Sequence, residues 1–242
     1  MLLAVLLISI IVIFILGLTY LFTKDVKIFK FLQFFLLLYI LGIIFLITVM
    51  YINLGYMPFS TPGETLVFLL LFVSVILYYL FKSDSNPVFV LSGTFFMALI
   101  NVLALFLTKS GKMFPDILNT NLFYIHVLLS MISYGFLFVG FLLTLLYLIF
   151  KIEIKQYDMI YKAGIFFYFT LLVSGSIWAQ NAWGLYWGAD PKETGALLTF
   201  IIYMCGVHSE GKQRHIFYIL GFISLIFCYV GITYLMKGLH SY

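Results

Sequence analysis

The chain has 242 residues, of which 64% are hydrophobic and 9% are charged, and its formal net charge at pH 7 is +4. Its mean hydropathy of +1.17 excludes an ordinary soluble globular domain and indicates a polytopic membrane protein in the lipid bilayer. The positive charges are spread over many loops, so the composition does not favour a nucleic-acid-binding protein.

Eight apolar runs, each long enough to cross a bilayer as a helix, predict an all-α bundle in a single domain over residues 1–242. The runs cover 2–22, 30–52, 65–81, 87–108, 122–150, 162–180, 193–208 and 214–236. The first run lacks a positively charged start and a small-residue cleavage site, so we expect it to remain as a span. Both cysteines, Cys205 and Cys228, lie within apolar runs and are expected to pack as small apolar residues.

Lysine and arginine are divided unequally between the two sets of loops. Nine of the 13 lie in the loops that follow the first, third, fifth and seventh runs. Cytoplasmic loops carry the excess of positive charge, so this set is predicted to be cytoplasmic. Both termini and the loop between the sixth and seventh runs are then on the outer side. The absence of a plastid-type targeting segment favours a bacterial inner membrane.

The loop between the sixth and seventh runs, residues 178–194, contains all three tryptophans of the chain: Trp178, Trp183 and Trp187. Tryptophan favours the membrane–water boundary, where its ring is buried and its N–H stays hydrated. Three of them in one loop predict a flat aromatic surface at the outer boundary. Such a surface suits a planar ligand.

Two outer loops end in the same pattern, Thr61-Pro62-Gly63-Glu64 before the third run and Asp190-Pro191-Lys192-Glu193 before the seventh. Each has a capping residue first, proline at the first helical position and glutamate two residues after the proline. The pattern predicts a capping box at each helix start. The first role expected for Asp190 and Glu193 is therefore structural, and a rigid helix start also fixes the geometry of a neighbouring site.

The chain has four histidines. His126 lies one turn into the fifth run and His240 lies just after the eighth, so both are expected at the same boundary as the tryptophans. His208 is expected near the inner side, and His215, beside Arg214, is expected to face solvent or lipid headgroups. Two imidazoles on opposite sides of a planar ring is how an iron porphyrin is held. Structural zinc fits less well, because no third or fourth ligand lies at the usual spacing.

Residues 183–194, WGLYWGADPKET, resemble the tryptophan-rich WWD signature of haem-handling membrane proteins. The ending DPKET is similar to that of the CcsA/ResC branch, the cytochrome c biogenesis proteins of system II. Similar segments occur at 58–64, 125–127, 207–208 and 238–242, so the resemblance covers nearly the whole chain. The chain departs from the pattern at Ala189 and Gly195, where the branch usually has tryptophan, and both changes reduce the aromatic surface.

The resemblance implies that haem b is passed to the outer face and attached covalently to the CxxCH cysteines of an apocytochrome c. This is the activity of a holocytochrome c synthase, or haem lyase, complex, and the sequence leaves open whether this chain is itself the enzyme. His208 corresponds to an iron ligand for haem arriving from the inner side. A CcsB/ResB-like membrane subunit is implied as the partner that supplies the second inner ligand.

The resemblance also implies the residues of the outer site. His126 and His240 correspond to its axial iron ligands and would be its catalytic residues. The residues implied to contact haem from the loop are Trp178, Trp183, Trp187 and Asp190.

Three other functions remain open. A CcmC-type protein would deliver haem to a chaperone without attaching it, but it usually has fewer spans and a different ending after the aspartate. A b-type cytochrome subunit would need pairs of deep histidines, and only His208 is deep. A transporter with an aromatic gate would be supported by broken helices and an internal repeat, and the sequence indicated neither.

Overall fold

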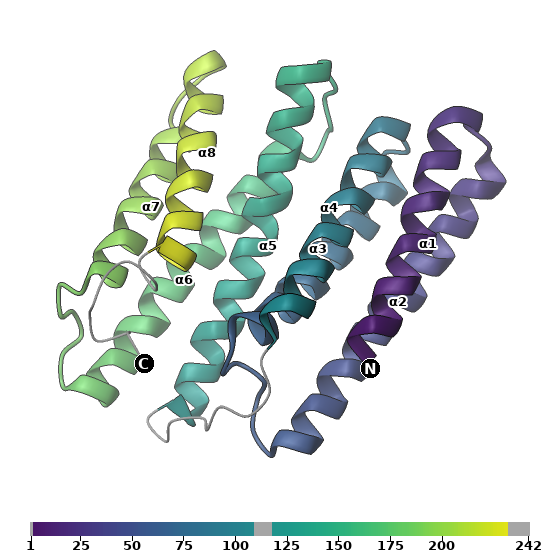
Figure 1. The fold of residues 1–242 in the computed structure, drawn as a ribbon. Coiled ribbons are helices and arrows are strands. Elements are labelled where there is room, and N and C mark those ends of the chain that lie inside the picture. Colours follow the sequence, from purple (N-terminus) through teal and green to yellow (C-terminus); the bar gives the residue numbers. More distant parts are fainter. Residues whose placement is uncertain (1, 109–117, 232–242) are drawn as a thin grey trace. The chain divides into compact units, whose positions relative to one another are not determined.

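The computed structural model describes residues 2–108 and 118–231, and these form eight α-helices (Figure 1). They are α1 (Leu2–Thr23), α2 (Val26–Leu54), α3 (Pro62–Ser83), α4 (Pro87–Leu107), α5 (Asn121–Phe150), α6 (Tyr157–Trp183), α7 (Pro191–Val207) and α8 (Gly211–Ile226). A π-helical turn, η2 (Phe227–Gly231), continues α8. The prediction of an all-α protein is confirmed, with one helix for each apolar run.

Seven of the described helices are long and apolar enough to cross a membrane, and the 20-residue span of α8 includes most of η2. The remaining helix, α7, has 17 residues, which is at the lower end of the range of about 17–25 for a spanning helix. The chain is therefore a multi-pass membrane protein. Most helices extend past the predicted bounds, because polar capping residues and left-handed glycines, and not the apolar runs, determine where they end.

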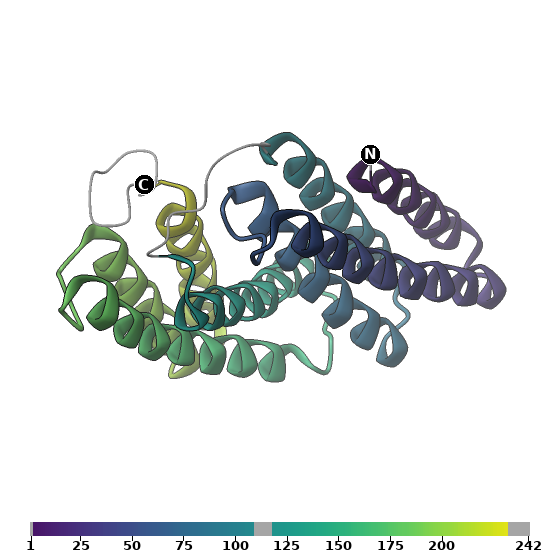
Figure 2. The same ribbon diagram turned by 90° about the horizontal axis from the view of Figure 1, so that it is seen from below.

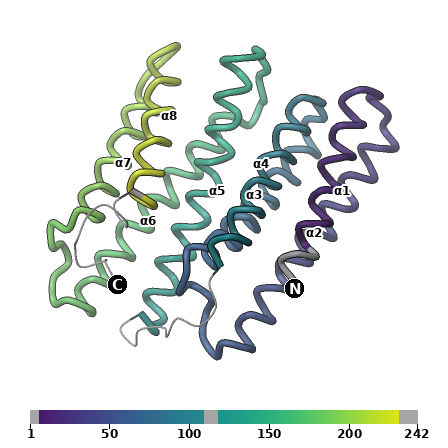
Figure 3. Tube along the Cα trace, in the orientation of Figure 1, coloured from purple at the N-terminus to yellow at the C-terminus, as the bar shows by residue number. Residues whose placement is uncertain are grey.

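The chain divides into two compact units, Met1–Asn119 and Thr120–Tyr242. In the first unit, α1 packs against α2 and α4, and α3 packs against the same two helices. In the second unit, α5 packs against α6 and α8, and α7 packs against the same two helices. Each unit is thus a closed ring of four consecutive helices, and Figures 2 and 3 allow the chain to be followed through each ring.

The two units share a detailed local pattern, which extends the similarity of the two helix starts that the sequence already shows. The second helix of each unit ends at a left-handed glycine, Gly55 (φ 74°) in one and Gly184 (φ 77°) in the other. Connections of equal length, 55–61 and 184–190, follow and lead into a helix that begins with proline. The shared pattern is confined to a short loop and a helix start.

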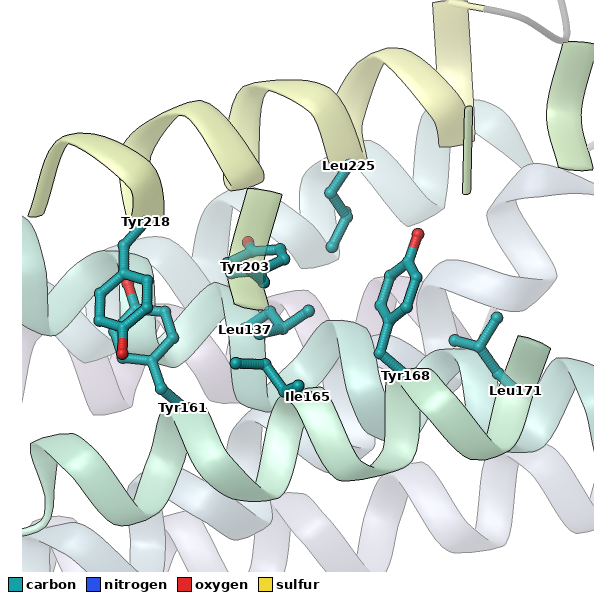
Figure 4. Close-up of a cluster of buried hydrophobic side chains, with 8 residues drawn as sticks. All are labelled: Leu137, Tyr161, Ile165, Tyr168, Leu171, Tyr203, Tyr218 and Leu225. Atoms are coloured by element: carbon teal, nitrogen blue, oxygen red, sulfur yellow. The ribbon is translucent and has the colours of Figure 1, made fainter. Parts of the chain in front are cut away.

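The core of the second unit is rich in tyrosine (Figure 4). Its buried side chains are Leu137, Tyr161, Ile165, Tyr168, Leu171, Tyr203, Tyr218 and Leu225. The rings of Tyr161 and Tyr218 are stacked, with centroids 3.6 Å apart and planes inclined by 14°. Gly206 and Gly221 allow this packing, since a Cβ at either position would lie within 3 Å of a tyrosine ring. Aromatic contact and glycine clearance therefore hold α6, α7 and α8 together.

Candidate functional site

His126 is held in a defined orientation against α6. Its Nδ1 lies 3.0 Å from the backbone carbonyl oxygen of Leu171. A carbonyl oxygen only accepts hydrogen bonds, so Nδ1 must carry the hydrogen and donate it. The lone pair of the neutral ring is then on Nε2. His126 is half-buried and has the protonation pattern of an imidazole that binds a metal through Nε2.

Gly175 provides the space in which the His126 ring lies. A Cβ at residue 175 would be 2.7 Å from Cε1 and 2.9 Å from Nδ1 of His126. Real Cβ contacts are essentially never that short, so only glycine allows the ring to lie over this turn of α6. Leu171, whose carbonyl accepts from the ring, lies one turn before Gly175. Gly175 could not be predicted from the sequence, because glycine is common in membrane helices and nothing local marks this one.

A chain of aromatic side chains continues from His126 to the end of α6. Phe123, one turn before His126, packs against Trp178 with ring centroids 5.4 Å apart. Trp178 in turn contacts Trp183 edge-on, at 6.0 Å and 82°. The structure therefore brings His126, Trp178 and Trp183 together at one end of α5 and α6. The Nε1 of Trp183 is buried and has no hydrogen-bond partner among the described residues, so a donor is available there.

The connection 184–190 presents exposed aromatic residues. The helix α6 extends to Trp183, so only these seven positions of the predicted loop are non-helical before α7. Tyr186 and Trp187 are 61% and 44% exposed. The backbone is nevertheless fixed at two points: Ser176 Oγ donates to the Tyr186 carbonyl at 2.8 Å, and the Gly188 amide donates to Glu193 Oε2 at 2.8 Å. An exposed but anchored aromatic surface results.

Asp190 is buried, with 5% of its surface exposed, and caps α7 by accepting from the Lys192 amide at 3.0 Å. The predicted capping box is only partly correct here, because Glu193 bonds to Gly188 and not to the Asp190 amide. The left-handed backbone of Ala189 (φ 52°) turns the chain just before the cap, and the amide that meets the carboxylate is that of Gly188.

The capping box predicted at Thr61 is confirmed. Its hydroxyl accepts from the Glu64 amide at 3.3 Å, and Glu64 Oε2 accepts from the amides of Ser60 and Thr61 at 2.7 and 3.2 Å. Glu64 and Glu193 thus have the same task in the two units. Each carboxylate reaches back from the first turn of a helix and holds the backbone of the preceding loop.

We predict that Glu193→Ala loosens the aromatic connection without unfolding α7, because Asp190 still caps the helix. Loss of one hydrogen bond to a charged acceptor costs about 1.5–3 kcal/mol when buried, and about 1 kcal/mol or less at this partly exposed position. Hydrogen exchange at the Gly188 amide should accelerate about fivefold. Glu193→Gln, which retains an acceptor oxygen, is the matched control, and unchanged exchange in Glu193→Ala would contradict the anchoring role.

The remaining histidines lie elsewhere. His208 is the exposed C-cap residue of α7, about 27 Å from Asp190 at 1.5 Å per residue, so the structure places it at the other end of the second unit. His240 lies outside the described residues. His215 differs from its expectation: it lies within α8, half-buried, with Nδ1 3.0 Å from the Tyr157 hydroxyl. The expectation failed because its partner is on α6, far away in the sequence.

Within residues 2–108 and 118–231, no group of three or more histidine, cysteine, aspartate or glutamate side chains is placed to hold a metal ion. Oriented single imidazoles beside aromatic rings suit a metal that brings its own equatorial ligands. An iron porphyrin fits that description, since it needs only one or two axial ligands from protein. The residues present at the aromatic end of the second unit therefore fit haem.

Comparison with known proteins gives a consistent match. The family model described as Cytochrome C assembly protein matches residues 60–240. A protein named Cytochrome c biogenesis protein CcsA from Trieres chinensis is 31% identical over 248 residues, covering 78% of this chain and 78% of that protein. The protein of the same name from Chlamydomonas reinhardtii is 32% identical, covering 83% and 65%. That from Prochlorococcus marinus is 29% identical, covering 79% and 77%.

Proposed function

We propose that this chain, which belongs to the Cytochrome C assembly protein family and is a CcsA-like cytochrome c biogenesis protein, binds haem b beside the 184–190 connection. It would hold the haem there for covalent attachment to an apocytochrome c. The observation that supports this best is the orientation of His126. Its Nδ1 is committed to the Leu171 carbonyl at 3.0 Å, so its lone pair is on Nε2, as an axial iron ligand requires.

The tryptophans and Asp190 would have different roles in binding the porphyrin. Trp183 and Trp187 would cover the porphyrin: Trp187 is exposed, and the buried Nε1 of Trp183 has no partner among the described residues and could donate to it. Trp178 is 3% exposed and packs behind Trp183, so its contribution is to position that ring. Asp190 caps α7 and thereby fixes the end of the connection.

Haem is the substrate in this scheme. Each cysteine thiol of a CxxCH segment adds across one vinyl group, with sulfur bonding to one vinyl carbon and hydrogen to the other. The chain contributes binding and orientation. His126 and His240 would hold the iron from opposite sides, so that the vinyl edge faces the incoming thiols. The histidine of CxxCH could then replace one of them and release the product.

Delivery of haem would involve the other end of the second unit. We propose that His208 receives haem there, together with a ligand from a CcsB/ResB-like subunit. The distribution of lysine and arginine supports an orientation in which that end is cytoplasmic and the aromatic connection is on the outer side of the membrane, which we propose to be a bacterial inner membrane. The apocytochrome would then meet the haem outside the cell membrane.

The test uses His126→Ala and His240→Ala, made with the partner subunit and an apocytochrome c. We expect the six-coordinate haem spectrum of the purified protein to be lost or altered in both variants, and covalent cytochrome c to fall at least tenfold. Cys205→Ala, on an exposed part of α7, is the control and should behave as wild type. Normal cytochrome c formation in both histidine variants would overturn the proposal. Bound haem without attachment in the wild-type complex would instead favour delivery to a chaperone.

A further inference from the structure

We infer that His215 is a further haem-iron ligand of this chain, at the end of the second unit opposite His126, which takes the second axial position beside His208 when the partner subunit is absent. The inference rests on the proposed haem-binding function, but its observations are separate. They come from a hydrogen-bonded network of side chains on α5, α6 and α8 that none of the outer-site residues touches.

The network contains four contacts. His215 Nδ1 lies 3.0 Å from the Tyr157 hydroxyl. That hydroxyl lies 2.9 Å from Thr144 Oγ1, and the Tyr161 hydroxyl lies 2.8 Å from the same atom. Thr144 Oγ1 also lies 3.0 Å from the Gly140 carbonyl oxygen. Thr144 and Tyr161 are buried, so water is not expected to exchange for these partners.

Counting hydrogens fixes the direction of every contact. The Gly140 carbonyl oxygen can only accept a hydrogen bond, so the Thr144 hydroxyl must donate its single hydrogen to that oxygen. Tyr157 and Tyr161 must then both donate to the two lone pairs of Thr144 Oγ1. Tyr157 has no second hydrogen, so its oxygen accepts the hydrogen bond from His215 Nδ1. This is the one arrangement that satisfies all four contacts.

His215 therefore has the same protonation pattern as His126. In both rings Nδ1 carries the hydrogen and donates it to a protein oxygen, and in both the lone pair is on Nε2. A metal-binding histidine usually donates the N–H of its other ring nitrogen to a protein oxygen, which fixes the tautomer and the orientation of the imidazole. In His215, Nε2 is on the edge of the ring directed away from Tyr157. His208, at the same end of the unit, is exposed and has no side-chain hydrogen bond to a described residue.

The surroundings of His215 favour a porphyrin over a bare metal ion. The ring of Tyr147 packs against the imidazole, with centroids 4.7 Å apart, and Lys151 Nζ lies 5.4 Å from the centre of that tyrosine ring. Lys151 thus offers a cation near the imidazole for a propionate carboxylate. A bare ion would need further ligands, and the described part of the chain has no cluster that supplies them.

The experiment uses the full chain carrying His126→Ala and His240→Ala, so that outer haem is removed. Ferric haem is titrated into this background and followed by its visible spectrum. Adding His215→Ala should weaken the remaining binding at least tenfold, and adding Tyr157→Phe should weaken it about tenfold, as loss of a supporting partner does at other metal sites. Haem binding that is unchanged by His215→Ala would overturn the inference and leave the outer-site proposal intact. Wild-type protein that binds no haem would overturn both.

Thr144→Val separates tautomer control from simple support. Without the threonine oxygen, the Tyr157 hydrogen is released and can donate to His215 Nδ1, which moves the imidazole hydrogen to Nε2. We expect the ¹⁵N NMR spectrum of His215 to show a protonated Nε2 and an unprotonated Nδ1, the reverse of the wild-type pattern. Haem binding should fall although His215 and Tyr157 are both still present. Thr199→Val is the matched control, since Thr199 is equally buried but bonds to Gly195 and Ser224. Retention of the Nδ1–H tautomer in Thr144→Val would contradict the inference.

Discussion

Gly175→Ala is expected to lose most of the haem of the outer site, although residue 175 has no side chain that could touch a ligand. The added Cβ would lie 2.7 Å from Cε1 and 2.9 Å from Nδ1 of His126, so the imidazole must move. Movement breaks the Nδ1 hydrogen bond to Leu171 and turns Nε2 away from the direction in which it is proposed to bind iron. Overpacking of this kind costs about 1–3 kcal/mol, and if all of it falls on the ligating geometry, the axial ligand is weakened roughly 5- to 150-fold.

The measurement is haem titration of purified Gly175→Ala, read as the loss of the six-coordinate spectrum and a shift in reduction potential. The helix itself should not suffer, because replacing a mid-helix glycine by alanine favours helix formation by roughly 1 kcal/mol. A general loss of folding would therefore not explain a haem-specific defect.

A double-variant cycle provides the control. If residue 175 acts through the imidazole, adding Gly175→Ala to His126→Ala should cause no further loss of haem. Additive losses would show that Gly175 matters for another reason, and wild-type haem affinity in the single variant would remove its positioning role altogether.

The sequence predicted the elements whose causes are local. Apolar runs predicted one helix each, and Thr61 and Asp190 were correctly placed as helix caps because capping depends on residues within one turn. The prediction of one flat surface from three loop tryptophans was wrong in part, because α6 continues to Trp183: Trp178 and Trp183 lie in the helix in edge-on contact, and Trp178 is buried. The family match supports the expected relation to CcsA proteins along most of the chain.

The features that could not be predicted depend on residues distant in the sequence. Nothing near Gly175 reveals that the ring of His126 lies over it, and nothing near His215 reveals the hydroxyl of Tyr157. The first relation arises because α5 and α6 are antiparallel, so that the start of one lies beside the end of the other, and the second arises because α6 and α8 run in the same direction, so that their first turns lie at the same end. The direction of the Glu193 carboxylate was also missed, because the left-handed turn at Ala189 decides which amide meets it.

The connections 55–61 and 184–190, each with the helix start that follows it, have one local pattern in two different surroundings. Gly55, Pro62 and Glu64 have the same spacing as Gly184, Pro191 and Glu193, and both glutamates hold loop amides. The segments differ at the residue between proline and glutamate, which is Gly63 in the first unit and Lys192 in the second. That difference has a steric reason within the first unit and leads to a second strong prediction.

Gly63→Ala is expected to destabilise the first unit more than other glycine-to-alanine changes there. A Cβ at residue 63 would overlap with the backbone nitrogen and Oγ1 of Thr108, the C-cap residue of α4. Backbone cannot rotate aside as a side chain can, so the start of α3 must separate from the end of α4. The cost is about 1–3 kcal/mol for overpacking, with up to about 2 kcal/mol more if the Thr61–Glu64 capping box opens.

Thermal unfolding of the detergent-solubilised chain tests this directly. A loss of 1–3 kcal/mol lowers the Tm of a chain of this size by roughly 2–12 °C. Gly42→Ala in α2 is the matched control, because its Cβ would meet only the flexible end of Leu6, at 2.9 Å, and that side chain can move. Gly42→Ala should therefore unfold within about 2 °C of wild type. Equal Tm values for the two variants would mean that the close backbone contact is not the reason for glycine at position 63. The difference from Lys192 would then have another origin.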